Sequence, residues 1–361
     1  MIAKTEAEIT KNWIENPDGR PTVSVHCMTY NQEGSIGDAL DSMLMQETDF
    51  PFEIVVHDDA STDGTAAVIR RYEAAYPRIM RPIYEEENLF SRKDGQLRSV
   101  IAARISGRYV AFLEGDDVWT DPAKLQKQAA FMDSHPDCVM CTHNTVRHYL
   151  DGSRPDSLFN DWKEVHLLTE REIFFGWDVH TSSFMIKREQ SVFPDEWGKY
   201  WFGDYIYLTH ALAYGNIYCL PDVMSRYNAH TANGVTILIQ GGSREEYLAR
   251  MMEKTDYLRE YDAFTEGRFH GIVEEQIVSM EMFARMFSMD LDSAQTTEKA
   301  REAWAISRDP YFKQYLRDLP FRARWKTAVI YRGACLGRLW VWAMNRRAAR
   351  KAPHAAGEEH V

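Results

Sequence analysis

Short apolar segments that alternate with helical segments constrain the fold of this chain more than any other feature of its sequence. Buried strands are predicted at Thr22–Thr29, Pro51–His57, Pro82–Glu85, Tyr109–Glu114 and Cys138–Thr145. Helical periodicity is present between them, in Glu33–Gln46, Thr65–Tyr76, Gln96–Ile105 and Ala123–Met132, the last with Asp121 as expected N-cap. Such alternation predicts an α/β fold, in which helices cover both faces of a mostly parallel, mixed sheet.

The remainder of the chain has a different pattern. Residues 146–230 are mixed, with strands expected at Ser182–Lys187 and Asn216–Leu220 and a helix at Asp204–Tyr214. After Gly242 the pattern is helical throughout, in Arg244–Tyr261, Ile272–Ser288 and Thr297–Ser307. We therefore expect two domains, an α/β domain in residues 1–241 and an all-helical C-terminal extension in residues 242–361.

Acidic residues follow the predicted strands. Asp58 and Asp59 end the second strand, and Glu114-Gly115-Asp116-Asp117 ends a later one. Ligands of open α/β sheets bind at the carboxyl ends of the strands, so these acids are expected to share one crevice. Like charges held together need a compensating cation, and carboxylate oxygens suit Mn²⁺ or Mg²⁺ bound with a diphosphate. The alternative is that these acids only cap helices and form turns.

Three segments together resemble the family 2 glycosyltransferases of GT-A fold, a Rossmann-like architecture. They are Thr29-Tyr30-Asn31, the segment from Glu53 to Thr65 (EIVVHDDASTDGT), and the segment from Glu114 to Gln128 (EGDDVWTDPAKLQKQ). The resemblance extends over residues 20–235. It implies an enzyme that transfers a sugar from a nucleotide-sugar donor, commonly a UDP-sugar, with the help of a divalent metal ion.

The resemblance also implies roles for individual residues. Tyr30 matches the aromatic residue that packs against the base, and Asp59 matches the carboxylate that hydrogen-bonds it. Asp116 and Asp117 match the acidic pair at the ribose and the metal, with Asp117 as the first choice of metal ligand. Glu114 replaces the first Asp of an Asp-x-Asp motif. The full set expected at the donor is Thr29, Tyr30, Asn31, Glu33, Asp58, Asp59, Glu114 and Asp116.

The resemblance further places the general base at the start of a later helix. Phe202-Gly203-Asp204-Tyr205 matches, so Asp204 is expected to deprotonate the acceptor hydroxyl in a single, inverting displacement. A plain N-cap is the alternative for Asp204. Relatives carry an Arg-x-His segment after this helix whose His completes the metal site. Here Asn228 has that spacing from Arg226, and His230 follows two residues later as a candidate metal or phosphate ligand.

The distribution of charge suggests where the enzyme acts. The net charge is −12, which argues against a nucleic-acid partner, yet residues 321–351 contain nine Arg or Lys and no acid. This basic tail is interleaved with tryptophans and indicates peripheral contact with an anionic membrane, with packing on the acidic body as the alternative. Scattered cysteines and a polar N-terminus fit a cytoplasmic protein. Cys138 and Cys141 are expected to be strand cysteines rather than zinc ligands.

These features predict an inverting glycosyltransferase that adds one sugar at a time to a saccharide or lipid-linked acceptor in bacterial polysaccharide or glycoconjugate biosynthesis. A catalytically inactive sugar-nucleotide-binding protein of the same fold is the main alternative, and the presence of Asp204 argues against it. A nucleotidyltransferase would need a glycine-rich phosphate loop after the first strand, where Thr29–Glu33 has none. The sugar and the acceptor stay open, and the C-terminal helices are a candidate homodimer surface.

Overall fold

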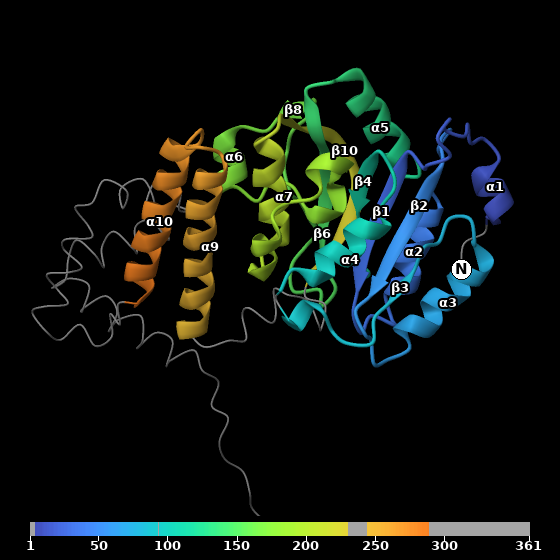
Figure 1. Cartoon of the computed structure of the whole chain (residues 1–361), viewed down its shortest axis with the longest axis horizontal. Coiled ribbons are helices and arrows are strands. Elements are labelled where there is room, and N and C mark those ends of the chain that lie inside the picture. The colour runs from blue at the N-terminus through green and yellow to red at the C-terminus, as the bar shows by residue number, and fades with distance from the viewer. Residues whose placement is uncertain (1–3, 93, 230–243, 289–361) are drawn as a thin grey trace, which may run out of the picture. The chain divides into compact units, whose positions relative to one another are not determined.

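The computed structural model describes residues 4–92, 94–229 and 244–288 (Figure 1). The chain separates into two compact units, Met1–Gly242 and Ser243–Val361. His230, the predicted helix Thr297–Ser307 and the basic tail at 321–351 lie outside the described residues. No helix among the described residues is long and apolar enough to cross a bilayer.

One mixed sheet forms the centre of the first unit. Its strands are β1 (Val23–Thr29), β2 (Phe52–Asp58), β3 (Ile83–Tyr84), β4 (Tyr109–Phe112), β5 (Val118–Trp119), β6 (Cys138–Tyr149), β7 (Ser157–Leu158), β8 (His166–Leu167), β9 (Met185–Lys187) and β10 (Asn216–Ala229). The main path runs β3-β2-β1-β4-β9-β6-β10-β5, with β7 paired to β6 and β8 to β10. The long ladders β1–β2 and β6–β10 are parallel, whereas β9 and β5 pair antiparallel. The predicted mostly parallel mixed sheet is confirmed.

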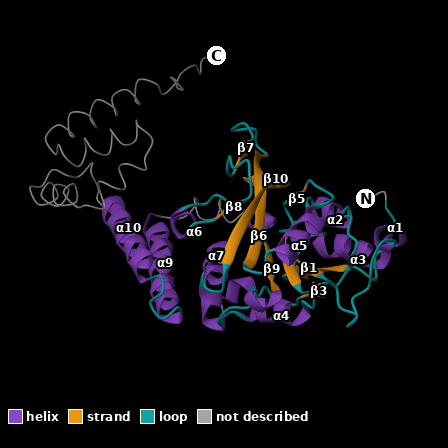
Figure 2. Cartoon of the chain, turned by 90° about the horizontal axis from the view of Figure 1, so that it is seen from above, coloured by secondary structure: helices purple, strands orange, loops and turns teal. Residues whose placement is uncertain are grey.

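Helices cover this sheet on both faces, which explains why β1, β2 and β4 are buried along almost their whole length. The helices of the first unit are α1 (Glu6–Thr10), α2 (Ile36–Leu44), α3 (Thr65–Ala75), α4 (Gln96–Arg104), α5 (Lys124–Ser134), α6 (Glu170–Phe175) and α7 (Gly203–Leu212). Figure 2 shows α2 and α5 on one side of β1 and α4 on the other. Successive side chains of a strand point to opposite faces. Val25 and Cys27 accordingly join the core with α2, α3 and α5, while Met28 packs with α4.

The two strands β6 and β10 are longer than predicted. The sequence analysis ended them at Thr145 and Leu220, but they continue as one parallel ladder to Tyr149 and Ala229. The extension was missed because it contains many polar side chains, among them the half-exposed His148 and the buried Asn228. Pairing with the neighbouring strand stabilises such segments without apolar periodicity. This extension is important because it carries β10 to the acidic cluster described below.

Two smaller expectations have clear outcomes. Helix α5 begins at Lys124 with Ala123 as N-cap, so the predicted N-cap at Asp121 was wrong by two residues. Asp121 Oδ1 instead accepts a hydrogen bond from Ala123 N–H at 2.8 Å, because its short side chain bonds the backbone two residues ahead. Cys138 and Cys141 are free and buried in β6, as expected of strand cysteines.

The second unit contains α9 (Arg244–Phe264) and α10 (His270–Ser288) among its described residues. Tyr261 of α9 stacks on Phe269, the residue before α10, with ring centroids 5.8 Å apart. Arg259 Nη2 also lies 3.0 Å from Glu281 Oε1 across the pair. The predicted helices Arg244–Tyr261 and Ile272–Ser288 are present, each a few residues longer than expected.

Candidate active site

The site is built where three parallel strands end. Thr29 of β1 is in register with Asp58 of β2, and Asp59 donates its N–H to the Thr29 carbonyl at 3.1 Å. On the other side of β1, Gly115 donates its N–H to the Met28 carbonyl at 3.0 Å. The backbone therefore brings the predicted donor residues of all three segments to one edge of the sheet.

The loops after β1 and β2 are joined by side chain–backbone hydrogen bonds. Asn31 donates its N–H to Ser61 Oγ at 2.9 Å, and its Oδ1 accepts from Thr62 N–H at 2.7 Å. Glu33 N–H similarly reaches Asp63 Oδ2 at 3.1 Å. Asn31 has a φ of 51°, in the left-handed region, which asparagine adopts more readily than most residues. Asn31 and Glu33 thus hold the two loops together.

Asp58 and Asp59 have different surroundings. Asp58 Oδ1 accepts from Ser61 N–H at 3.1 Å, which is a turn contact. Both carboxylate oxygens of the buried Asp59 accept backbone N–H groups, from Leu89 at 2.7 Å and Phe90 at 3.0 Å. Asp59 therefore fixes the loop after β3 against the end of β2.

Gly115 is needed for the close approach of two of these segments. A Cβ built on it would meet Gln32 Oε1 and lie 2.9 Å from Thr29 Oγ1. Thr29 and Gln32 also bond each other, at 2.8 Å. Only a residue without a side chain lets the turn that follows β4 lie this close to the end of β1. Tyr30 at the same edge has 42% of its surface exposed, so its ring is accessible to a ligand.

The turn after β4 gathers three carboxylates. One oxygen each of Glu114, Asp116 and Asp117 can be chosen so that all three lie within 4.8 Å of one another. Asp117 is 1% exposed, and its Oδ1 accepts the Asn228 N–H at 2.9 Å. Its Oδ2 is buried without a hydrogen-bond partner among the described residues. A buried carboxylate oxygen without a partner, next to two further carboxylates, is the donor set that a divalent cation requires.

Asn228 joins this cluster from β10. Its Nδ2 donates to the Asp116 carbonyl at 2.6 Å, and its own Oδ1 is a second buried oxygen without a partner in the described chain. The sequence analysis noted Asn228 at the spacing of the family's histidine but assigned no role to it. The structure places Asn228 against both Asp116 and Asp117, whereas His230 is not described.

Burial and the closeness of the carboxylates in the cluster raise the pKa of two of them. The pKa of Glu114 is raised to about 8 by burial and by the neighbouring carboxylates of Asp116 and Asp204. The Glu114 side chain is itself exposed to solvent, although protein atoms surround it at longer range. The pKa of Asp117 is also raised, by burial and by the charges of Asp116 and Glu114, while the Asn228 N–H acts in the opposite direction. A bound cation would relieve this repulsion.

Asp204 lies in the first turn of α7, behind the N-cap residue Phe202. Phe202 makes no side-chain cap, and Asp204 Oδ1 accepts its neighbour's N–H, from Tyr205, at 2.8 Å. Asp204 is half-buried. Its charge contributes to the raised pKa of Glu114, so Asp204 lies near the acidic cluster. The structure therefore brings together Asp204 and the strand-end acids, which are 87 or more residues away in the sequence.

His180 is a site residue that sequence reasoning missed. Its Nδ1 is 3.7 Å from Asp117 Oδ2, and it stacks on Tyr227 with ring centroids 4.3 Å apart. The Ser182 N–H donates to this Nδ1 at 3.3 Å, so the ring proton resides on Nε2. Burial and the charge of Arg147 lower the pKa of His180 to about 3, so this contact is not an ion pair near neutral pH. No motif signals His180 from sequence alone.

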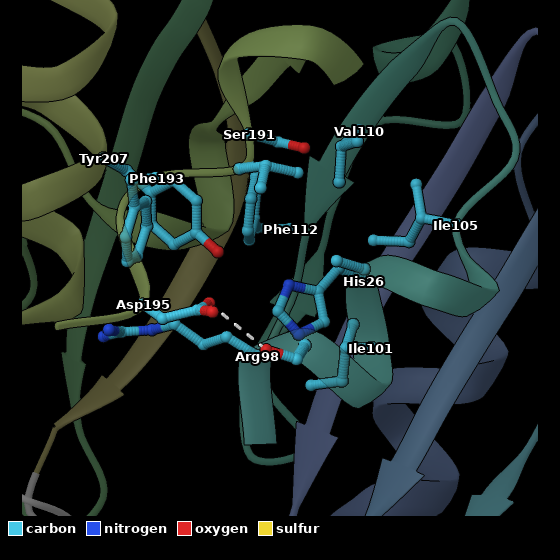
Figure 3. Close-up of a pocket in the computed structure, with 13 residues that line it drawn as sticks. His26, Arg98, Ile101, Ile105, Val110, Phe112, Ser191, Phe193, Asp195 and Tyr207 are labelled. Carbon is cyan, nitrogen blue, oxygen red and sulfur yellow. Dashed lines mark hydrogen bonds between the residues drawn. The ribbon is translucent and has the colours of Figure 1, made fainter. Parts of the chain in front are cut away.

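A small pocket lies on the α4 face of the sheet, on the side that carries Phe112 (Figure 3). His26 of β1 lines it, 8% exposed, with its Nε2 lacking a partner in the described residues. Arg98 from α4 and Tyr207 from α7 complete the wall. Along the chain, Phe112 precedes Glu114 by two residues and Tyr207 follows Asp204 by three.

A mixed α/β sheet with helices on both faces and the strand order described above is the GT-A fold. The solved structure of TarS from Staphylococcus aureus in complex with UDP-GlcNAc has this fold. It superposes with a TM-score of 0.54 at 19% identity, covering 89% of this chain and 92% of that one.

Sequence relatives give the family. The profile of Glycosyl transferase family 2 matches residues 24–190. The uncharacterized glycosyltransferase alr2836 of Nostoc is 30% identical over 237 residues, 62% of this chain and 70% of its own length. The uncharacterized protein Rv1520 of Mycobacterium tuberculosis is 36% identical over 225 residues, 59% of this chain and 60% of its own. The chain thus spans about 60% of the length of the first of its curated relatives. It belongs to glycosyl transferase family 2.

A further relative is named for a specific activity. TarS of S. aureus, named as a poly(ribitol-phosphate) beta-N-acetylglucosaminyltransferase, is 33% identical over 155 residues. That match covers 42% of this chain and 26% of TarS.

Proposed function

We propose that residues 1–241 form the catalytic domain of an inverting, metal-dependent glycosyltransferase that moves one sugar from a UDP-sugar to an acceptor hydroxyl. The observation that carries the proposal is the convergence of Glu114, Asp116 and Asp117 with Asp204 at one sheet edge. Binding of UDP-GlcNAc by the structurally similar TarS supports the choice of nucleotide.

The donor would bind across the strand ends. Tyr30 offers an exposed ring to the base, and the buried Asp59 lies at the same edge of the sheet. Asp117 and Asp116 would hold Mn²⁺ or Mg²⁺, with Asn228 Oδ1 or His230 as a further oxygen or nitrogen ligand. The metal, when bound, would neutralise the negative charge that develops on the leaving diphosphate.

Asp204 would act as the general base. Its place in the first turn of α7 favours the ionised carboxylate, because the N-terminus of a helix carries a partial positive charge. The carboxylate takes the proton of the acceptor hydroxyl while that oxygen bonds to the anomeric carbon. On the opposite face, the bond from this carbon to the diphosphate breaks and its electron pair leaves with the diphosphate, so the configuration inverts.

The acceptor is proposed to be a saccharide or a lipid-linked saccharide in bacterial polysaccharide or glycoconjugate assembly. The naming of TarS as a poly(ribitol-phosphate) glycosyltransferase supports a surface-polymer role. Attachment to the inner face of the membrane through residues 321–351, and homodimerisation, stay proposals from the sequence. Comparing liposome flotation of the full chain with a version ending at Pro320 tests the membrane contact, which equal binding would exclude.

A donor panel tests the proposed function. Thermal stability of the full chain is measured with each common nucleotide sugar, with and without Mn²⁺. We expect a UDP-sugar to stabilise the protein only when Mn²⁺ is present, since both bind the folded state alone. Stabilisation by no donor, with or without metal, would refute the proposal.

A matched pair of variants tests the base. Asp204→Asn should keep metal-dependent donor binding and lose transfer, which one general base accelerates by about 10²–10⁴-fold. Asp18→Asn is the control, because Asp18 is exposed and precedes β1, at the opposite end of the strand from Thr29. Undiminished turnover in Asp204→Asn would remove this residue from the mechanism. Donor binding by a wild type that turns over no acceptor would favour the inactive sugar-nucleotide-binding alternative.

A further inference from the structure

An arginine and four aromatic rings form a cluster beside the acidic site. We call Arg147, Phe159, Trp177, His180 and Tyr227 the arginine–aromatic cluster. The Arg147 Cζ lies 4.2 Å from the centroid of the Phe159 ring and 5.0 Å from that of Trp177. Phe159 and Trp177 meet edge to face at 5.0 Å, and Tyr227 stacks on His180. The cluster is continuous with the site, because His180 Nδ1 is 3.7 Å from Asp117 Oδ2.

Arg147 has no charged partner in the part of the chain that the structure describes. Its guanidinium makes cation–π contacts there but no hydrogen bond or ion pair, although the chain has 54 acidic and 42 basic residues. Asp156, which precedes Ser157, the residue paired with Arg147 in the hairpin, pairs instead with His148 at 2.8 Å. A cation–π contact uses the charge of the guanidinium and not its N–H donors, so the fork that matches a carboxylate or phosphate stays available.

The cluster also offers an accessible apolar surface. Trp177 is 49% exposed, whereas Phe159 beneath it is 8% exposed. A rigid, half-exposed ring beside a buried one is a suitable surface for the apolar face of a sugar ring. Exposed tryptophan next to an unpaired arginine therefore favours a ligand that combines a ring with a negative charge.

The position of the cluster separates it from the proposed nucleotide site. Tyr30 and Asp59 follow β1 and β2, while Arg147 is on β6, on the other side of β4 in the sheet order β3-β2-β1-β4-β9-β6-β10-β5. β4, which is followed by Glu114, Asp116 and Asp117, thus lies between the proposed nucleotide site and Arg147. A group bound at Arg147 would belong to the second substrate rather than to the base end of the donor.

We propose that the arginine–aromatic cluster binds the acceptor, and that Arg147 pairs with an anionic group, a carboxylate or a phosphate, on that acceptor saccharide. Trp177 carries the adjoining sugar ring. This inference rests on the proposed glycosyl transfer and adds the chemical class of the acceptor. The enzyme would then prefer acidic saccharides or phosphorylated acceptors over neutral ones.

The test uses small probes that differ in charge. Ligand-observed NMR titrations of the full chain, with UDP and Mn²⁺ saturating the donor site, compare methyl β-glucuronide and glucose 6-phosphate with the neutral methyl β-glucoside. We expect at least one anionic probe to bind about tenfold more tightly than the neutral one, the effect of one charge-assisted contact. Arg147→Gln should abolish the preference, and Trp177→Ala should weaken all three probes.

Controls keep the outcomes separate. Arg154→Gln removes a neighbouring arginine that likewise contacts only a ring, Tyr149, in the described chain, and should leave the preference intact. Arg147→Lys keeps the charge without the fork and should show an intermediate preference. Equal binding of charged and neutral probes by the wild type, or an unchanged preference in Arg147→Gln, would overturn the proposal. Loss of UDP affinity in Arg147→Gln would also overturn it, by assigning Arg147 to the donor. Failure of UDP and Mn²⁺ to bind the wild type would instead refute the proposed function.

Discussion

Protonation of the buried His26 is expected to make the protein less stable in mild acid. His26 is 8% exposed, and burial, followed by the charges of His57 and Arg98, lowers its pKa to about 3. In the unfolded chain a histidine titrates near pH 6.5, so the unfolded state alone takes up the proton as the pH falls below that value. Between pH 7 and pH 5 this difference lowers the free energy of unfolding by about 2 kcal/mol. The magnitude holds for any folded pKa well below 5.

Urea unfolding of wild type and His26→Gln at pH 7 and pH 5 measures this effect. Other titrating groups are common to both proteins, so the gap between the two unfolding free energies should change by about 2 kcal/mol in favour of the variant at pH 5. His26→Asn is a second variant, because its different cavity shifts stability equally at both pH values. Gaps that do not change with pH in either variant would show that His26 takes up its proton in the folded state.

Three further predictions address the site and the core. Asp117→Asn should lose Mn²⁺-dependent stabilisation while its metal-free form stays at least as stable as wild type, as thermal unfolding with and without metal would show; a retained metal effect contradicts the ligand assignment. Gly115→Ala should cost about 1–3 kcal/mol in urea unfolding, because its Cβ meets Thr29, and an unchanged midpoint would contradict the contact. Burial lowers the pKa of Lys124 to about 7, so between pH 7 and pH 9 the wild type should gain about 2 kcal/mol of unfolding free energy over Lys124→Met; parallel curves would refute this.

The sequence was sufficient for the sheet and for its functional edge. Runs such as Thr22–Thr29 and Pro51–His57 are rich in apolar residues because both faces of the sheet are covered, and that pattern is visible without a structure. The polar ends of β6 and β10 were not predictable in this way. Their order comes from pairing with each other, and a pairing between residues 80 positions apart leaves no periodicity in either segment.

The residues of the candidate site likewise fall into those that a sequence pattern locates and those that only strand pairing places. Glu114, Asp116 and Asp117 could be located because they follow a recognisable strand, and Asp204 because it follows a motif. His180 and Arg147 could not, because their roles depend on which strand β6 neighbours. The placement of Asn228 likewise needed the long β10 ladder, which brings its N–H to Asp117.

The hydrogen bonds between the loops after β1 and β2 have a consequence for the entropy of ligand binding. Asn31 and Glu33 already hold the partner loop in the chain without ligand, so docking a nucleotide would freeze few additional torsions. Calorimetry should then report a modest entropic penalty. A change in the preferred nucleotide base could then be reached by exchanging single side chains on these pre-ordered loops, without a new loop.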